Sequence, residues 1–255
     1  MITTRQRLAS RPWPVLSMPL VELILGGQEI FRRPRARFNW LIDRLCGPVD
    51  DAQRVNIVAF DNRTEVSLKE ELRSALQSYQ PGRMDRPDAI PAAALLLLYE
   101  RDDGVHVLFQ ERSYQVEHHK GEISFPGGAR DEKDGSAAGT ALRETYEEVG
   151  VAPDDVDLLG ELDEIWTISN FRLRTFVGWL QDWPYPFQLQ QSEVAALLEV
   201  PLGYLAEPGN QVEDVREING RCVVLPSYYW EEKRIWGATA RIVTNFLDVY
   251  RTLER

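Results

Sequence analysis

Three glutamates stand close together in the middle of the chain, within residues 143–150 (Arg-Glu-Thr-Tyr-Glu-Glu-Val-Gly). At about 100° per residue, a helix places Glu144, Glu147 and Glu148 within roughly 100° of arc. Clustered carboxylates repel one another unless a cation lies among them, and Mg²⁺ is typically held by a few carboxylates plus substrate phosphate. The spacing therefore indicates a divalent-metal site for phosphate chemistry, with a solvated acidic helix face as the alternative.

A helix must position these carboxylates, and the sequence supplies signals for both of its ends. Ser136 is expected to be the N-cap, and Gly150 stands where a C-terminal glycine belongs. Arg143 is expected to pair with Glu147, one turn further on. The residues predicted to pack on a sheet form a small-residue stripe: Ala138, Ala141, Leu142, Thr145 and Val149. Upstream, Pro126-Gly127-Gly128 is a loop that lets the backbone approach a ligand closely.

These segments together resemble the signature box of the Nudix hydrolases, a family that hydrolyses nucleoside diphosphates linked to another moiety. Gly128 corresponds to the box glycine and residues 143–150 to the acidic run. The spacing from Gly128 to Arg143 is one residue longer than usual, and the family's early glutamate is missing, with Asp134 nearest to its place. The longer spacing resembles the coenzyme A diphosphatase branch of the family.

An upstream run resembles the same branch. Arg112-Ser113 is followed at the family's spacing by residues 121–128 (Gly-Glu-Ile-Ser-Phe-Pro-Gly-Gly), and His119 fits the bacterial form of this stretch. Glu117 replaces the arginine that the branch has between them. The resemblance covers roughly residues 90–250. It implies an α+β fold, a Nudix-type α/β/α sandwich with a mixed central sheet, which the alternation of predicted strands and helices also favours.

The resemblance also implies roles for particular residues, with Mg²⁺ or Mn²⁺ as the cofactor. The expected metal ligands, which all offer oxygen atoms, are Glu144, Glu147, Glu148 and the main-chain carbonyl of Gly128. The expected catalytic residues are Glu147, Glu148, Arg143 and Glu193. Arg143 orients a glutamate, and the general base lies either on the box helix or on a distant loop, where Glu193 is the candidate. The expected substrate contacts are Arg112, His119, Lys120 and Gly127.

The implied reaction is hydrolysis of the diphosphate of coenzyme A or its thioesters, giving 4′-phosphopantetheine and adenosine 3′,5′-bisphosphate. The alternative substrates are other nucleoside diphosphate derivatives, such as ADP-ribose or NADH. A Nudix-fold binding module that has lost catalysis is a third hypothesis, which the three retained glutamates disfavour.

Composition narrows the class of protein. The 255 residues are 44% hydrophobic and include seven tryptophans, as in an ordinary globular protein. Two cysteines make neither a disulfide framework nor a zinc site, so a reducing cytoplasm is the expected setting. Three histidines exclude a histidine-rich metal site. The net charge of −11 argues against non-specific nucleic-acid binding. The partner that the resemblance implies is a small nucleotide substrate.

The chain divides into an N-terminal accessory segment, residues 1–90, and a Nudix hydrolase domain, residues 91–255. The accessory segment is expected to be an added subdomain or a dimerisation element, which makes a homodimer one expectation. Residues 1–37 hold seven arginines and two glutamates, so organelle targeting is the alternative to a cytoplasmic location. The apolar run at residues 21–25 is too short for a membrane span.

Periodicity predicts the elements around the box. Strands are expected at residues 54–60, 92–99, 105–111, 156–162 and 173–180, with a hairpin turn at residues 102–104. Helices are expected at residues 67–78, where Ser67 caps, at residues 193–199 after Ser192, and at residues 234–250.

Overall fold

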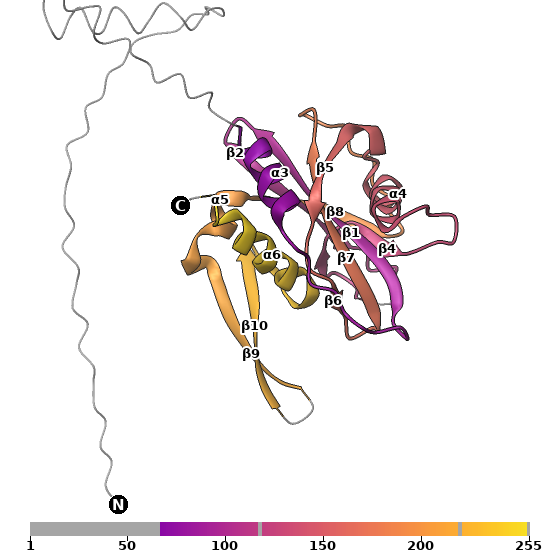
Figure 1. Cartoon of the computed structure of the whole chain (residues 1–255), viewed down its shortest axis with the longest axis vertical. Coiled ribbons are helices and arrows are strands. Elements are labelled where there is room, and N and C mark those ends of the chain that lie inside the picture. Colours follow the sequence, from indigo (N-terminus) through magenta and orange to yellow (C-terminus); the bar gives the residue numbers. More distant parts are fainter. Residues whose placement is uncertain (1–66, 117–118, 219–220, 254–255) are drawn as a thin grey trace, which may run out of the picture. The chain divides into compact units, whose positions relative to one another are not determined.

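The computed structural model describes residues 67–116, 119–218 and 221–253 of the chain. In this part, helices lie on both faces of a mixed β-sheet, which confirms the predicted sandwich (Figure 1). The strand predicted at residues 54–60 lies outside the described residues. None of the described helices is long and apolar enough to cross a membrane.

Strand β1 (Ile90–Arg101) lies at the centre of the main sheet. Its run of apolar residues is buried on both faces, as the sequence predicts. A turn leads into β2 (Gly104–Arg112), where Gly104 has φ +115°, a value that favours glycine. On its other side β1 pairs in parallel with β7 (Phe171–Leu180), which is followed by antiparallel β5 (Val156–Glu161).

Shorter strands complete this sheet in the order β3-β2-β1-β7-β5, with β4 on β1, β6 on β7 and β8 on β2. Their bounds are β3 Ile123–Ser124, β4 Gly127–Ala129, β6 Ile165–Trp166 and β8 Val194–Pro201. Pairing of β4 with the first half of β1 brings the Pro-Gly-Gly loop against the middle of the sheet.

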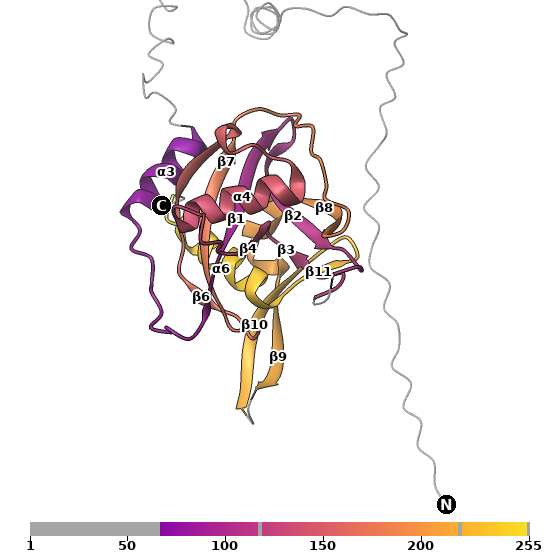
Figure 2. The same ribbon diagram turned by 90° about the vertical axis from the view of Figure 1, so that its right-hand side faces the viewer.

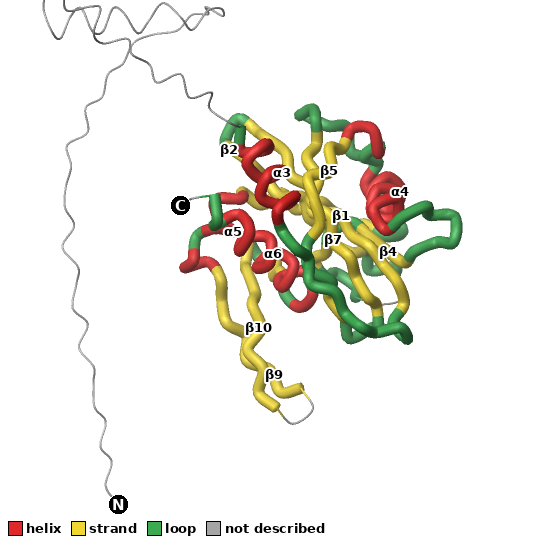
Figure 3. Tube along the Cα trace, viewed as in Figure 1, coloured by secondary structure: helices red, strands yellow, loops and turns green. Residues whose placement is uncertain are grey.

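Helix α4 (Ala137–Val149) covers one face of the sheet (Figures 1 and 2). Its Ala141 and Val149 are buried in one core with Leu95 and Leu97 of β1. Helices α3 (Leu68–Ser78) and α6 (Gly237–Tyr250) cover the other face (Figure 3). Successive β1 side chains therefore belong to opposite cores, which is why the whole strand is apolar.

The helix predicted at residues 67–78 is confirmed. The Ser67 hydroxyl accepts a hydrogen bond from the Glu70 N–H at 3.4 Å. Leu72 and Leu76 of α3 are buried in the core that contains α6. This helix therefore packs on the sheet, although it belongs to the segment that the sequence analysis assigns to the N-terminal extension.

Two helix predictions differ from the structure. Residues 193–199 do not form a helix: β8 begins at Val194 and pairs antiparallel with β2. Its Leu198 and Val200 are buried in the core that contains α6, and Val194 is buried in the core that contains α4. The helix predicted from residue 234 begins at Gly237, since β11 (Lys233–Ile235) precedes it.

A second antiparallel sheet, absent from the sequence prediction, has the order β11-β10-β9. Its other two strands are β9 Gln211–Ile218 and β10 Arg221–Trp230, which form the long hairpin in Figure 1. The short helices are η1 Pro153–Asp155, between α4 and β5, and α5 Leu202–Ala206 and η2 Pro208–Asn210, between β8 and β9.

Candidate active site

Helix α4 has the ends that its sequence predicts. The Ser136 hydroxyl accepts from the Gly139 N–H at 3.0 Å, and Gly150 takes the left-handed conformation with φ 78°. Ala141, Thr145 and Val149 are buried. The sheet-facing stripe is therefore confirmed, and it leaves the acidic residues on the flank beside β4.

Glu148 is the most enclosed of the three glutamates, with 2% of its surface exposed. Its Oε2 accepts two hydrogen bonds, from Gln110 Nε2 at 2.9 Å and from the Gly127 N–H at 2.8 Å. Its Oε1 lies 4.0 Å from Arg112 Nη1. One carboxylate oxygen is thus fixed by β2 and β4, while the other has no hydrogen bond within the described part of the chain.

Burial raises the pKa of Glu148 to about 7. The Gly127 N–H, Gln110 and Arg112 act in the opposite direction, and the negative charge of Glu144 raises the pKa further. A cation beside this group would favour its ionised form.

Glu144 lies directly against the glycine-rich loop. A Cβ atom on Gly128 would come within 2.5 Å of the Glu144 carboxylate, so a residue without a side chain is required for this approach. Burial raises the pKa of Glu144; Arg143 opposes this, and the negative charges of Glu147 and Glu193 add to it. Glu193 immediately precedes β8, so the start of this strand lies near enough to the acidic face of α4 for its charge to affect Glu144.

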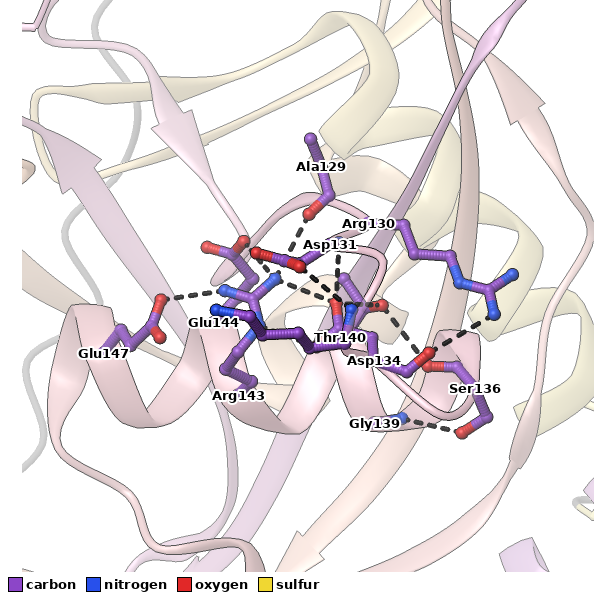
Figure 4. A network of polar contacts seen from close by, with 11 residues as sticks. Ala129, Arg130, Asp131, Asp134, Ser136, Gly139, Thr140, Arg143, Glu144 and Glu147 are labelled. Atoms are coloured by element: carbon purple, nitrogen blue, oxygen red, sulfur yellow. Dashed lines mark hydrogen bonds and ion pairs between the residues drawn. The ribbon is translucent and has the colours of Figure 1, made fainter.

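Arg143 joins several acidic groups (Figure 4). It contacts Glu147 at 2.8 Å, as predicted, and also Glu144 at 2.9 Å. Its Nε and Nη2 donate to the two oxygens of Asp134 at 2.8 and 3.0 Å. Nη2 also donates to the carbonyl of Ala129 at 3.2 Å. The side chain therefore links α4 to the loop that precedes it.

Asp134 is a site residue that the sequence analysis did not select. The Thr140 hydroxyl and the Asp131 N–H donate to it, in addition to Arg143. The hydrogen bonds from Arg143 are the main cause that holds the pKa of Asp134 far below its usual range. The sequence did contain a signal for Asp134, because it is the residue closest to the place of the family's early glutamate. Gln110, the other missed residue, had no such signal.

Glu147 and Glu193 are the exposed members of the predicted catalytic set. The Glu147 side chain is 55% exposed and bonds to Arg143. Glu193 immediately precedes β8, and its carbonyl accepts from the Ser113 N–H at 2.7 Å. Within the described residues its carboxylate has no hydrogen bond or ion pair, so it is free to contact water or a ligand.

Two of the predicted substrate contacts, His119 and Lys120, lie in the loop between β2 and β3, whereas Gly127 begins β4. Arg112 ends β2, and its backbone bonds to Gly121 and Glu122 across the loop. His119 is bonded through its two ring nitrogens to Glu122 at 3.1 Å and Ser169 at 3.0 Å. Lys120 is exposed. Thus Arg112 and Gly127 lie beside Glu148, whereas His119 is engaged with other side chains of the protein.

One other position of the loop between β2 and β3 concerns the resemblance to the coenzyme A branch. Glu117, which replaces the arginine of the coenzyme A branch, lies outside the described residues.

The donor set fits a hard divalent cation. Glu144 and Glu148 are two oxygen donors from successive turns of one helix, each with its pKa raised by burial, and the backbone of Gly128 adjoins them. In the described part of the chain no group of three or more His, Cys, Asp or Glu side chains converges as a metal cluster. Glu147 is directed to Arg143 instead, and its role as a metal ligand stays a prediction.

Comparison with known proteins finds one matching family model, and the similar proteins include two relatives and one solved structure. A family model described as the NUDIX domain matches residues 89–217. The protein named "Uncharacterized Nudix hydrolase NudL" of Escherichia coli strain K12 is 32% identical over 153 residues, covering 59% of this chain and 78% of the relative. Its namesake in Cronobacter sakazakii is 32% identical over 152 residues, with the same shares of the two chains. A MutT/nudix family protein from Enterococcus faecalis has a crystal structure with a TM-score of 0.43 at 15% identity, covering 81% of this chain and 76% of that one.

Proposed function

The chain belongs to the Nudix hydrolase family, and from this premise we propose that it hydrolyses the diphosphate of coenzyme A or its thioesters. As a Nudix hydrolase it is an enzyme that acts on nucleoside diphosphate derivatives. The proposed products are 4′-phosphopantetheine and adenosine 3′,5′-bisphosphate. Water adds to one phosphorus, and the bond from that phosphorus to the bridging oxygen breaks. Each product keeps one of the two phosphates of the diphosphate, and the adenosine product carries it beside its existing 3′-phosphate.

The observation that carries the proposal is the junction at Glu148. Gly127, at the end of the upstream run that resembles the coenzyme A branch, donates its N–H to Glu148. Arg112, at the start of that run, lies 4.0 Å from the other oxygen of the same carboxylate. The upstream run and the box helix therefore meet at one group, which supports a shared role in binding and cleaving one substrate.

We propose that Glu144, Glu147, Glu148 and the carbonyl of Gly128 hold the metal. When bound, Mg²⁺ or Mn²⁺ supplies neutralisation of the diphosphate charge. Arg143 fixes the positions of Glu144 and Glu147 through the ion pairs described above. Gln110 and Gly127 fix Glu148, so that only Oε1 is available to a ligand.

Glu193 is the proposed general base, which takes a proton from the attacking water. Its carboxylate has no side-chain partner within the described residues, and it acts electrostatically on Glu144. Arg112 and Lys120 are proposed to contact the phosphates. His119 is proposed to hydrogen-bond a phosphate, for which its bond to Glu122 or to Ser169 must break.

Product analysis by mass spectrometry tests the proposal. Coenzyme A, ADP-ribose and NADH are each incubated with Mg²⁺, with Mn²⁺ or with a chelator, beside Glu148→Gln and the exposed loop variant Glu132→Gln. We expect metal-dependent release of adenosine 3′,5′-bisphosphate from coenzyme A, reduced at least about 10–100-fold in Glu148→Gln and unchanged in Glu132→Gln.

The other outcomes are equally informative. Cleavage of ADP-ribose or NADH alone would retain the Nudix chemistry and reject coenzyme A as the substrate. Ligand binding without turnover of any of the three would favour a binding module over an enzyme.

We also propose the wider setting of this activity. Residues 1–90 act as an accessory segment to the hydrolase domain at residues 91–255, in a homodimer that works in the cytoplasm. Size-exclusion chromatography with light scattering tests the dimer. Microscopy of a tagged full chain tests the location, and signal confined to an organelle would instead support targeting by the arginine-rich N-terminus.

A further inference from the structure

A cavity of about 370 Å³ lies beside the first turns of α4, and its lining includes none of the three box glutamates. Four arginines line it: Arg83, Arg130, Arg172 and Arg174. Glu164 is its acidic lining residue. A cavity of this size lies at the lower end of the range of about 300–1,000 Å³ that is usual for small-molecule sites.

The lining comes from elements that are distant in sequence. Arg172 and Arg174 belong to the start of β7, and Ala92 belongs to the start of β1, which pairs with it in parallel. Thr140 of α4 and Arg130, which follows β4, form another part of the wall. The sheet and the helix that position the box glutamates thus also form this second cavity.

The charges around the cavity do not cancel. Glu161 binds Arg83 at 2.6 and 2.8 Å and Arg174 at 2.6 and 2.7 Å, so one carboxylate serves two guanidinium groups. Within the described part of the chain the Arg130 side chain donates only to a neutral acceptor, the carbonyl of Asp134, at 3.3 Å. Among the described residues the guanidinium of Arg172, whose backbone pairs within the sheet, has no hydrogen bond or ion pair. Two guanidinium groups at the cavity therefore lack an acidic partner.

Glu164 places a negative charge in the lining of this otherwise arginine-rich cavity. Its Oε2 accepts from the Met84 N–H at 2.9 Å, which leaves Oε1 able to accept from a ligand. Guanidinium groups bind phosphate through paired N–H donors, and a carboxylate oxygen accepts from a hydroxyl group. Phosphate alone would satisfy the arginines but would be repelled by Glu164.

We propose that this cavity is a second binding site, which takes a phosphorylated small molecule carrying hydroxyl groups, such as a sugar phosphate. Arg130 and Arg172 bind the phosphate, and Glu164 accepts from a hydroxyl. The site is separate from the carboxylates that cleave the diphosphate, and the inference does not depend on coenzyme A being the substrate.

Isothermal titration of the full chain in the presence of a chelator tests the site, with ribose 5-phosphate as the probe and inorganic phosphate for comparison. We expect ribose 5-phosphate to bind more tightly, and Arg172→Gln to weaken it by about tenfold or more. Arg130→Gln should act in the same direction. Arg251→Gln makes the same change of charge at the C-cap of α6, which packs in the other core from α4, and should leave binding unchanged.

Glu148→Gln is the control for binding at the diphosphate site, and it should also leave the affinity for ribose 5-phosphate unchanged. The proposal is overturned if ribose 5-phosphate does not bind, if inorganic phosphate binds as tightly, if Arg251→Gln weakens binding equally, or if Glu148→Gln abolishes it. Thermal melts of each variant show that a loss of binding is not a loss of folding.

A competition experiment shows whether the phosphate bound in the cavity belongs to coenzyme A or to a separate molecule. If coenzyme A displaces ribose 5-phosphate from the metal-free protein, the cavity holds a phosphorylated part of the substrate itself. If both bind together, the occupant is a separate molecule. Either result supports the site, and neither requires turnover, so failure of the coenzyme A proposal would be seen independently.

Discussion

A single carboxylate, that of Glu148, depends on groups that the acidic run does not contain. Gln110 is fully buried in β2, and its Nε2 and the Gly127 N–H together occupy Oε2 of Glu148. Two donors on one oxygen fix the plane of the carboxylate and direct Oε1 toward Arg112. The orientation of this group is therefore set by β2 and β4 as much as by the helix that carries it.

Gln110→Ala should reduce kcat by about tenfold or more, because Glu148 loses one of the two donors that orient it. The buried position also predicts a loss of about 1–3 kcal/mol in the free energy of unfolding. Steady-state kinetics and denaturant unfolding measure the two effects, with the exposed Gln77→Ala as the control. Unchanged kcat in Gln110→Ala would show that Glu148 needs no support from β2.

Gly128→Ala should affect activity far more than stability. The added methyl group would lie 2.5 Å from the carboxylate of Glu144, and the flexible side chain can move away at little cost to the fold. A displacement of about 1 Å at a catalytic group can reduce the rate by about 100-fold. Gly135→Ala is the matched control, because its Cβ would meet nothing within 4 Å. Equal activity of the two variants would contradict the close approach.

At the scale of elements, sequence periodicity predicted the helices and strands whose pattern is unambiguous. The cap at Ser136, the end at Gly150 and the apolar run of β1 all specify local structure directly. Residues 194–200 contain alanine, leucine and glutamate, which favour helices, yet they form β8 because β2 offers a partner strand. This choice is made by tertiary contacts, which no local pattern reveals.

The same limit applies to the candidate site. The acidic helix face could be predicted, since its residues are neighbours on one element. The pairing of Gln110 with Glu148 could not, because it depends on how β2 and β4 align with α4. Asp134 is intermediate: its spacing from Gly128 was visible, but its donors are Asp131 of the folded loop and two residues of α4, Thr140 and Arg143.

Asp134→Asn should loosen the loop before α4 in a pH-dependent way. The folded-state pKa of Asp134 is lowered by Arg143, so its contribution to stability is complete above the unfolded pKa of about 4 and decreases as the pH falls below that value. At pH 7 we expect a loss of about 1.5–3 kcal/mol in the free energy of unfolding. The difference from the wild type should shrink between pH 4 and pH 2 (roughly the window set by the lowered pKa).

Denaturant unfolding at several pH values, in the presence of a chelator, measures this dependence. The exposed Asp182→Asn is the control and should follow the wild type at every pH. A destabilisation by Asp134→Asn that stays constant down to pH 2 (far below the ordinary pKa of about 4) would show that the ion pair with Arg143 is not its cause.

At the scale of the whole molecule, the sheet is covered by a helix, α3, that lies before residue 89, where the family match begins. Leu72 is fully buried, and it lies in the core that α6 and β5 share. Lys69 of the same helix forms an ion pair with Asp157 on β5. The hydrolase domain is therefore covered on one face by a helix from the preceding segment.

Leu72→Ala should lower the free energy of unfolding by about 2–5 kcal/mol, because it opens a cavity between α3 and the sheet. Activity below the melting temperature should be retained, since α3 and the acidic helix lie on opposite faces. Thermal and denaturant unfolding measure the change, with Ile168→Ala as the control at a position that is 92% exposed. A change below about 0.5 kcal/mol in Leu72→Ala would place α3 outside the cooperative unit.

The three-way junction at Glu148 has a consequence for the order in which the protein folds. Its hydrogen bonds span 38 and 21 residues of sequence, whereas α4 forms through contacts only a few residues apart. Non-local contacts form late, because the chain must first close the loops between them. After dilution from denaturant, the helical circular dichroism signal should therefore recover before hydrolytic activity does, and Gln110→Ala should lengthen that lag.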